Sequence, residues 1–93
     1  MTPVEFDAIV LQEGNTFVAH CPELDVSSCG QDLNEARRNL QTAVRLFIEE
    51  ADKLGTLTDI LQESGFELGH NGHWRSPRIV STDVLLVGPQ PRK

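Results

Sequence analysis

The feature that most constrains the fold is a long apolar stripe at helical spacing in the middle of the chain. Between residues 33 and 54, apolar side chains recur at steps of three and four residues, so they line one face of a helix of about six turns. Asp32 precedes the stripe and Glu35 follows three residues later, as in a capping box. Gly55 stands where a left-handed residue ends many helices. We therefore predict an amphipathic helix over residues 33–54, which needs a second layer to cover its apolar face.

Segments before this helix predict three antiparallel strands. Residues 4–12 alternate between two faces, and residues 16–20 follow a turn at residues 13–15. Pro22 ends this hairpin because proline cannot donate a hydrogen bond to the ladder. Residues 26–29 predict the third strand.

The last third of the chain predicts smaller elements. Residues 57–64 predict a short helix with Thr56 as its N-cap, and an Asn-Gly pair predicts a hairpin over residues 66–75. Residues 79–87 predict a final strand, which could lie parallel or antiparallel to its neighbour.

These elements give an α+β fold class, a two-layer β-β-β-α-(short α)-β sandwich whose antiparallel sheet is covered by the long helix. A chain of 93 residues forms one domain, which we place at residues 1–88, with a flexible tail at residues 89–93. The helix covers only one face of the sheet, and the sheet edges are open to pairing. We therefore expect a homodimer or tetramer.

Charge is distributed unevenly along the chain. Residues 1–69 carry 13 acidic and four basic side chains, whereas residues 70–93 carry four basic side chains and a single acidic one. An acidic surface repels polyanions, so we do not expect this chain to bind DNA directly. It suits a basic protein partner, because complementary charge accelerates association, although acidity alone also keeps a small domain soluble.

The sequence also indicates where in the cell the protein resides. Its apolar runs fall far short of the roughly 20 residues that span a bilayer, and its first residues lack the pattern of a secretory signal. We expect a soluble, cytoplasmic protein without membrane association.

The candidate metal ligands and nucleophiles lack the arrangement that such sites need. Cys21 and Cys29 have no second ligand at the spacing of a zinc site, and His70 and His73 straddle the predicted hairpin tip. His20 cannot activate the neighbouring Cys21, because adjacent strand residues point to opposite faces. We therefore predict no metal site and no cofactor.

Four carboxylates near the predicted hairpin raise the question of metal-dependent phosphodiester cleavage: Glu5, Asp7, Glu23 and Asp25. Solvated strand and loop positions explain them more simply. The sequence also lacks a phosphate-binding loop, a zinc-protease motif and a nucleophile elbow. We predict a protein without enzymatic activity, and a weak nuclease that depends on Asp7 stays open as an alternative.

A run of short motifs gives the clearest functional indication. It comprises the predicted hairpin at residues 7–21, the loop PEL at 22–24 and the helix entry GQDLNEA at 30–36. In order and spacing this run resembles the HicB-type antitoxin family, whose hairpin ends in P-x-L/F-P-G and whose helix starts at G-x-T-x-E-E-A. Asp25-Val26 replaces the common Pro-Gly, and Asp32 replaces the customary Thr. The resemblance covers residues 4 to about 66.

The resemblance implies a single HicB-like domain with a β-β-β-α-β, partial ribonuclease H-like topology. It also implies a role in a prokaryotic toxin–antitoxin system. The antitoxin binds the small basic HicA toxin, an mRNA-cleaving protein with a double-stranded-RNA-binding-like fold, and covers its catalytic histidine. Many members carry a DNA-binding segment, whereas residues 67–93 predict a hairpin and a strand.

Our prediction is therefore an antitoxin-like binding protein without a DNA-binding segment of its own. The alternative is a stand-alone homo-oligomeric HicB-like module with no toxin partner. The candidate partner-binding residues are acids in loops and on the exposed helix face: Glu13, Glu23, Asp25, Glu49 and Asp52.

Overall fold

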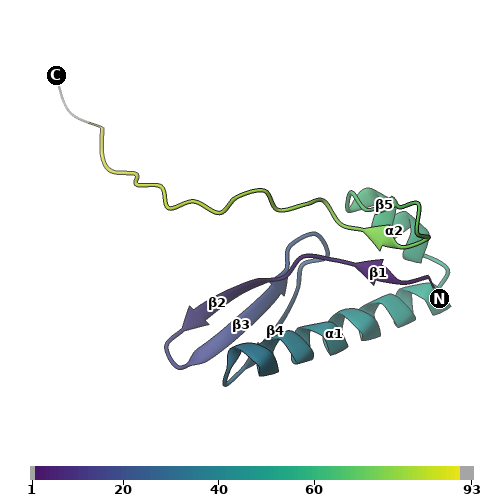
Figure 1. Ribbon diagram of the computed structural model, residues 1–93, viewed down its shortest axis with the longest axis horizontal. Helices are drawn as coiled ribbons and strands as arrows, with labels where there is room; N and C mark the ends of the chain where they lie inside the picture. Colours follow the sequence, from purple (N-terminus) through teal and green to yellow (C-terminus); the bar gives the residue numbers. More distant parts are fainter. Residues whose placement is uncertain (1, 91–93) are drawn as a thin grey trace.

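The computed structural model describes residues 2–90 and contains two helices and six strands in those residues (Figure 1). In chain order these elements are β1 (Val4–Glu5), β2 (Ile9–Glu13), β3 (Thr16–Cys21), β4 (Val26–Gly30), α1 (Leu33–Lys53), α2 (Leu57–Glu63), β5 (Glu67–Leu68) and β6 (Trp74–Arg75). The predicted α+β class is thus confirmed. Of the predicted tail at residues 89–93, residues 91–93 lie outside the described part of the chain.

The strands form two small sheets instead of the single antiparallel sheet predicted. One has the order β2-β3-β4 and is antiparallel throughout, with Ala19 opposite both Val10 and Ser28. The other has the order β1-β6-β5, in which β1 runs parallel to β6 and β6 antiparallel to β5. β2 is an edge strand, because β3 is the strand that pairs with it in the described residues.

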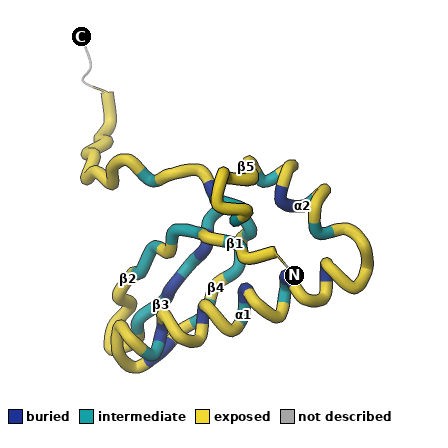
Figure 2. The backbone as a smooth tube through the Cα atoms, turned by 45° about the vertical axis from the view of Figure 1, so that its right-hand side comes forward, coloured by how far each residue is buried: buried dark blue, intermediate teal, exposed yellow. Residues whose placement is uncertain are grey.

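α1 covers one face of the larger sheet and supplies most of the core, as its apolar stripe predicts (Figure 2). Val10, Phe17 and Val26 pack against the core from the sheet side. The fully or nearly fully buried cluster consists of Ala19, Cys21, Ala36, Leu40, Val44 and Ile48. Burial of this stripe stabilises a helix that propensity alone leaves marginal.

Both ends of α1 have the capping that the sequence indicates. The carboxylate of Asp32 accepts a hydrogen bond from the backbone N–H of Glu35 at 2.8 Å. Gly55 has φ +74°, and the N–H of Thr56 donates to the carbonyl of Ala51 at 3.0 Å, as in a Schellman motif. Thr56 is the N-cap residue of α2, as predicted, but its side chain makes no capping hydrogen bond there. Its hydroxyl donates to the Ala51 carbonyl instead, because the Schellman turn holds it against the end of α1.

The predicted strand at residues 4–12 is interrupted. β1 and β2 are separated by residues 6–8, which have no strand pairing. At this break the backbone N–H of Asp7 donates to the hydroxyl of the buried Ser76 at 3.3 Å. A contact between residues 69 positions apart thus replaces the local ladder.

The predicted hairpin over residues 66–75 is confirmed with shorter strands. β5 and β6 pair Glu67 with Arg75 and Leu68 with Trp74, and five residues connect them. Gly72, with φ +80°, lies at this turn. The Asn-Gly signal located the turn correctly, although the loop is longer than a two-residue hairpin.

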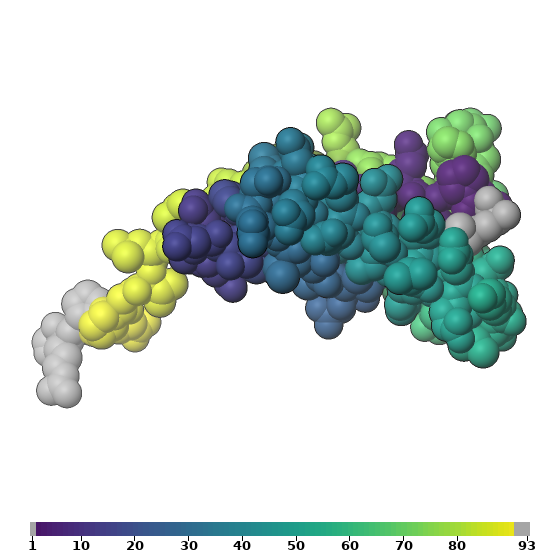
Figure 3. All heavy atoms as spheres, turned by 90° about the horizontal axis from the view of Figure 1, so that it is seen from below, coloured from purple at the N-terminus to yellow at the C-terminus, as the bar shows by residue number. Residues whose placement is uncertain are grey.

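The predicted final strand at residues 79–87 is wrong. These residues have no strand pairing, and the chain runs as an exposed extension from the body of the molecule (Figures 1 and 3). Val84, Leu86 and Val87 are each more than 90% exposed. A strand needs a neighbour for its backbone groups, and this segment finds none within the described chain. Among the described residues, no helix is both long and apolar enough to cross a membrane.

Candidate functional site

The five acidic residues proposed as partner contacts do not form one surface. Glu13 lies at the turn that joins β2 to β3, and Glu23 and Asp25 lie at the opposite end of β3. β3 has six residues, so the two turns are about 20 Å apart. Glu49 and Asp52 are exposed near the C-terminal end of α1. A partner that covers one face would contact one of these groups and not all three.

Of the three groups of acidic residues, the pair in the turn between β3 and β4 has the most unusual local structure. Asp25 has φ +53°, and its side chain is 95% exposed. Its backbone N–H donates to the carbonyl of Pro22 at 3.3 Å, which closes the turn. His20 lies beneath it, with Nε2 3.9 Å from the Asp25 carboxylate and Nδ1 2.6 Å from the Ser27 hydroxyl. The turn therefore presents a carboxylate outward from a well-connected hairpin end.

Glu23 adds a second carboxylate to the same turn. Its Oε2 atom is buried and has no hydrogen-bond partner. The neighbouring Cys21 is fully buried, and its burial raises the pKa of the thiol, an effect that the nearby Glu23 charge reinforces. A buried oxygen without a partner is unfavourable, so the Glu23 carboxylate lowers the stability of this turn.

Asp7 has a structural contact and is not free to hold a metal. Its carboxylate accepts hydrogen bonds from the Arg75 guanidinium at 2.9 Å and from the backbone N–H of Ile79 at 3.1 Å. These two donors, the Ile79 N–H first, hold the pKa of Asp7 below its ordinary value. Within residues 2–90, no group of three or more histidine, cysteine or acidic side chains could hold a metal ion. The Asp7-dependent nuclease therefore has no geometric support here.

We expect Asp7→Asn to be about 1 kcal/mol less stable than the parent chain at pH 6, because it loses a partly exposed ion pair and weakens one hydrogen bond. The folded state favours ionised Asp7, so this contribution is complete above the ordinary pKa of 3.8 and is lost as pH falls through the lower folded value. The stability difference should thus vanish in strong acid. Urea unfolding of both chains across pH measures it, with Asp83→Asn as the control. An equal difference at every pH would contradict the assignment.

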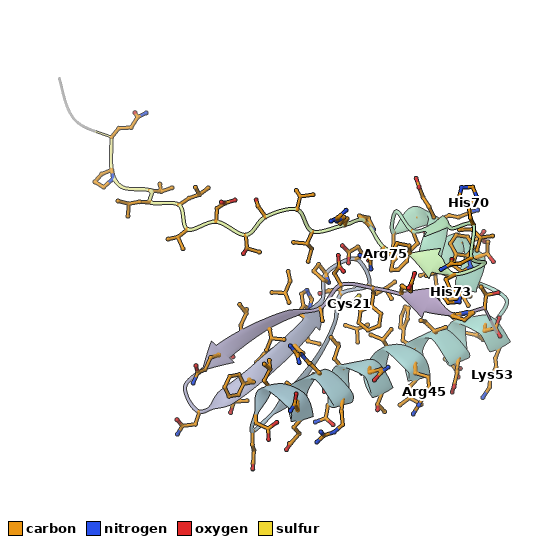
Figure 4. The ribbon with its side chains drawn as sticks, in the orientation of Figure 1. Cys21, Arg45, Lys53, His70, His73 and Arg75 are labelled. Carbon is orange, nitrogen blue, oxygen red and sulfur yellow. The ribbon has the colours of Figure 1, made fainter. Side chains whose placement is uncertain are left out.

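The remaining candidate ligands are dispersed. Cys21 faces α1, while Cys29 is exposed on the other face of the sheet, so the two thiols cannot share a ligand or a disulfide. His70 and His73 lie with Arg75 around β5 and β6, away from Cys21 (Figure 4). His73 is 4.0 Å from the carboxylate of Glu5 through its Nδ1 atom.

A groove between β1 and α1 was not predicted. Two adjoining hollows of about 330 and 450 Å³ share Val4, Phe6 and Gln41 as lining residues. Arg37 and Arg45 on α1 also line them. The spacing of Arg37, Gln41 and Arg45 places them along one side of the helix, which was visible in the sequence. The apolar floor from β1 was not, because it depends on tertiary packing.

No protein-family model, curated protein or solved structure gives a significant match to this chain.

Proposed function

We propose that this chain is an antitoxin-like protein that binds a small basic mRNA-cleaving toxin of the HicA type and blocks its active site. It acts by occlusion in the cytoplasm, without a catalytic step or a cofactor. The proposal takes its partner from the resemblance of residues 4–66 to the HicB family. A basic nuclease and an acidic inhibitor are electrostatically complementary, because the inhibitor's carboxylates can occupy positions that RNA phosphates would otherwise take.

The observation that best supports the proposal is the folded state of the motif-bearing segment. Its hairpin, turn and helix occur as β2, β3, β4 and α1, with the helix on one face of the sheet. If β1 and β2 are taken as one interrupted strand, the order is β-β-β-α-α-β-β, in which the last strand, β6, is parallel to β1. This order supports the partial ribonuclease H-like topology that we assign to the domain.

The turn between β3 and β4 is the part of the surface that we assign to the toxin. It combines the exposed carboxylate of Asp25 with the unpartnered oxygen of Glu23, on the loop that corresponds to the family's P-x-L/F motif. A basic side chain of the toxin could pair with the exposed carboxylate of Asp25. Glu13 and the helix acids Glu49 and Asp52 would lie at the margin or outside the contact.

Copurification tests the proposal directly. The untagged chain is expressed with the tagged product of the small adjacent reading frame, and complex formation and RNA cleavage are measured. We expect a complex that weakens with salt and that silences cleavage. A toxin that binds this chain but stays active would contradict occlusion, and the absence of a complex would favour the stand-alone oligomeric module.

Charge reversal locates the contact. Glu23→Lys with Asp25→Lys should weaken toxin binding at least tenfold, because two carboxylates at the contact become like charges. Glu63→Lys with Glu67→Lys changes the net charge equally at exposed positions elsewhere and serves as the control. The pairs Glu49→Lys with Asp52→Lys, and Glu13→Lys alone, should have smaller effects. If reversal of all five acids leaves the affinity within tenfold, the electrostatic part of the proposal is wrong.

A further inference from the structure

Residues 79–87 have the sequence of a strand but no place in the fold of a single copy. The segment lies between Pro77 and Pro89, contains no proline or glycine and has one charged side chain, Asp83. Five of its apolar side chains are 84–101% exposed: Val80, Val84, Leu85, Leu86 and Val87. In Figure 2 most of the C-terminal part of the tube has the colour of exposed residues. The five side chains occupy both alternating faces, which is typical of a strand covered on both sides.

The larger sheet has a free edge at which such a strand could pair. β2 pairs with β3 on one edge and has no strand on the other in the described residues. Leu11, in the middle of β2, is 55% exposed. Phe6 and Ala8, which directly precede β2, line the groove beside α1. A strand added at this edge would therefore find backbone partners, with apolar surface near both of its faces.

The contact at Asp7 marks the point where pairing between β1 and the chain after β6 ends. The parallel pairing with β1 proceeds through the N–H groups of Trp74 and Ser76, which donate to the carbonyls of Pro3 and Glu5. The next N–H in that alternation belongs to residue 78, but it is the N–H of Ile79 that is bound, and its acceptor is the Asp7 side chain. The backbone ladder with β1 thus ends at Ser76, and Ile79 is held by a side chain instead.

The elongated shape of the chain agrees with a segment at residues 79–87 that does not pack on the chain's own core. The radius of gyration is 16.6 Å, against about 12 Å for a compact domain of this length. The longest dimension is 57 Å, and the C-terminal residues extend beyond the body of the molecule (Figure 3).

We propose that residues 79–87 of one copy add as a strand to the free edge of β2 in a second copy, and that the second copy does the same in return. In each copy residues 79–87 lack a neighbouring strand, and β2 is an edge strand that carries the exposed Leu11, so two copies can satisfy both. The exchange uses the same two surfaces on each protomer and closes as a twofold dimer. This dimer does not depend on binding of a toxin.

Light scattering during gel filtration of the full chain tests the exchange. We expect a dimer at micromolar concentration. Val84→Asp with Leu86→Asp should raise its dissociation constant at least tenfold, and Leu11→Lys should weaken it through the other surface. Leu46→Asp with Leu54→Asp is the matched control, because these side chains are also exposed and apolar but lie on and just after α1. The control should remain dimeric.

Hydrogen exchange on the unmodified chain identifies the partner of the segment. Amides of residues 79–87 and of β2 should become protected together as dimer forms. Three results would overturn the proposal: a monomeric chain at all concentrations, a dimer unaffected by both interface variants, and protection of residues 79–87 in the monomer. The last would show that the segment folds back on its own β2.

Discussion

Leu40→Ala is expected to lower the free energy of unfolding by about 2–5 kcal/mol. Leu40 is 1% exposed and is one of the largest fully buried side chains, in the middle of the face that α1 presents to the sheet. Truncation removes buried apolar surface and leaves a cavity between a helix and a sheet that cannot close around it. A chain of 93 residues has a total stability of roughly 5–14 kcal/mol, so this one change removes a large fraction of it.

Leu46→Ala is the matched control for this prediction. Leu46 lies on the same helix and is 58% exposed, so its truncation should change stability by no more than about 0.5 kcal/mol. Urea unfolding followed by circular dichroism measures both variants, at a fixed protein concentration because the dimer that we propose would contribute to stability. Equal effects of the two substitutions would show that α1 does not bury the face that we assign to the core.

The parts of the fold that local sequence determines were predicted closely. The helix was expected at residues 33–54 and extends from Leu33 to Lys53, because the apolar stripe, the Asp32 cap and Gly55 all lie within or next to the element. The turn at residues 13–15 and the hairpin near Gly72 also depend on a few neighbouring residues. Capping and turn geometry need no knowledge of distant contacts.

The parts that distant contacts determine were predicted poorly. The break between β1 and β2 depends on Asp7, whose partners Arg75 and Ile79 are 68 and 72 positions away. The segment at residues 79–87 has the composition of a strand, but composition does not say which chain provides the neighbouring strand. A segment that has the sequence of a strand but no pairing strand in its own chain is what strand exchange between two copies predicts.

In the candidate site, too, features that depend on local sequence were predicted and features that depend on distant contacts were not. Exposure of the acidic residues followed from their positions in turns and on the polar side of a helix. The distance of Glu13 from Glu23 and Asp25 also followed from the predicted hairpin, but the position of these turns relative to Glu49 and Asp52 did not, because it depends on how the hairpin lies over α1. The sequence likewise gave no sign that Glu23 has a buried oxygen without a hydrogen-bond partner.

The helix-entry motif that contributes most to the family resemblance has a structural explanation. In the run GQDLNEA at residues 30–36, Asp32 caps the helix, Ala36 is fully buried and Gly30 ends β4 directly beneath the first turn of α1. These residues form the joint between sheet and helix. The motif therefore contributes to the fold, and we propose that the choice of partner lies in other residues, such as Asp25.

Gly30→Ala is expected to lower the free energy of unfolding by about 1–3 kcal/mol. An added Cβ would lie 2.5 Å from the backbone nitrogen of Ala36 and 2.8 Å from the carbonyl carbon of Glu35. Both are helix backbone atoms, so relief requires α1 to move away from β4, the strand against which it packs most extensively. The φ of Gly30 lies outside the left-handed region, so the expected cost is steric and not conformational.

Gly88→Ala is the control, because an added Cβ at Gly88 meets no atom within 4 Å and its φ is also outside the left-handed region. That variant should unfold like the parent chain. Toxin binding by Gly30→Ala should decline only as far as the folded fraction declines, whereas Asp25→Lys, at a side chain that is 95% exposed, should weaken binding without unfolding the protein. A stable Gly30→Ala variant that no longer binds would place the motif in the partner contact and contradict its assignment to the joint.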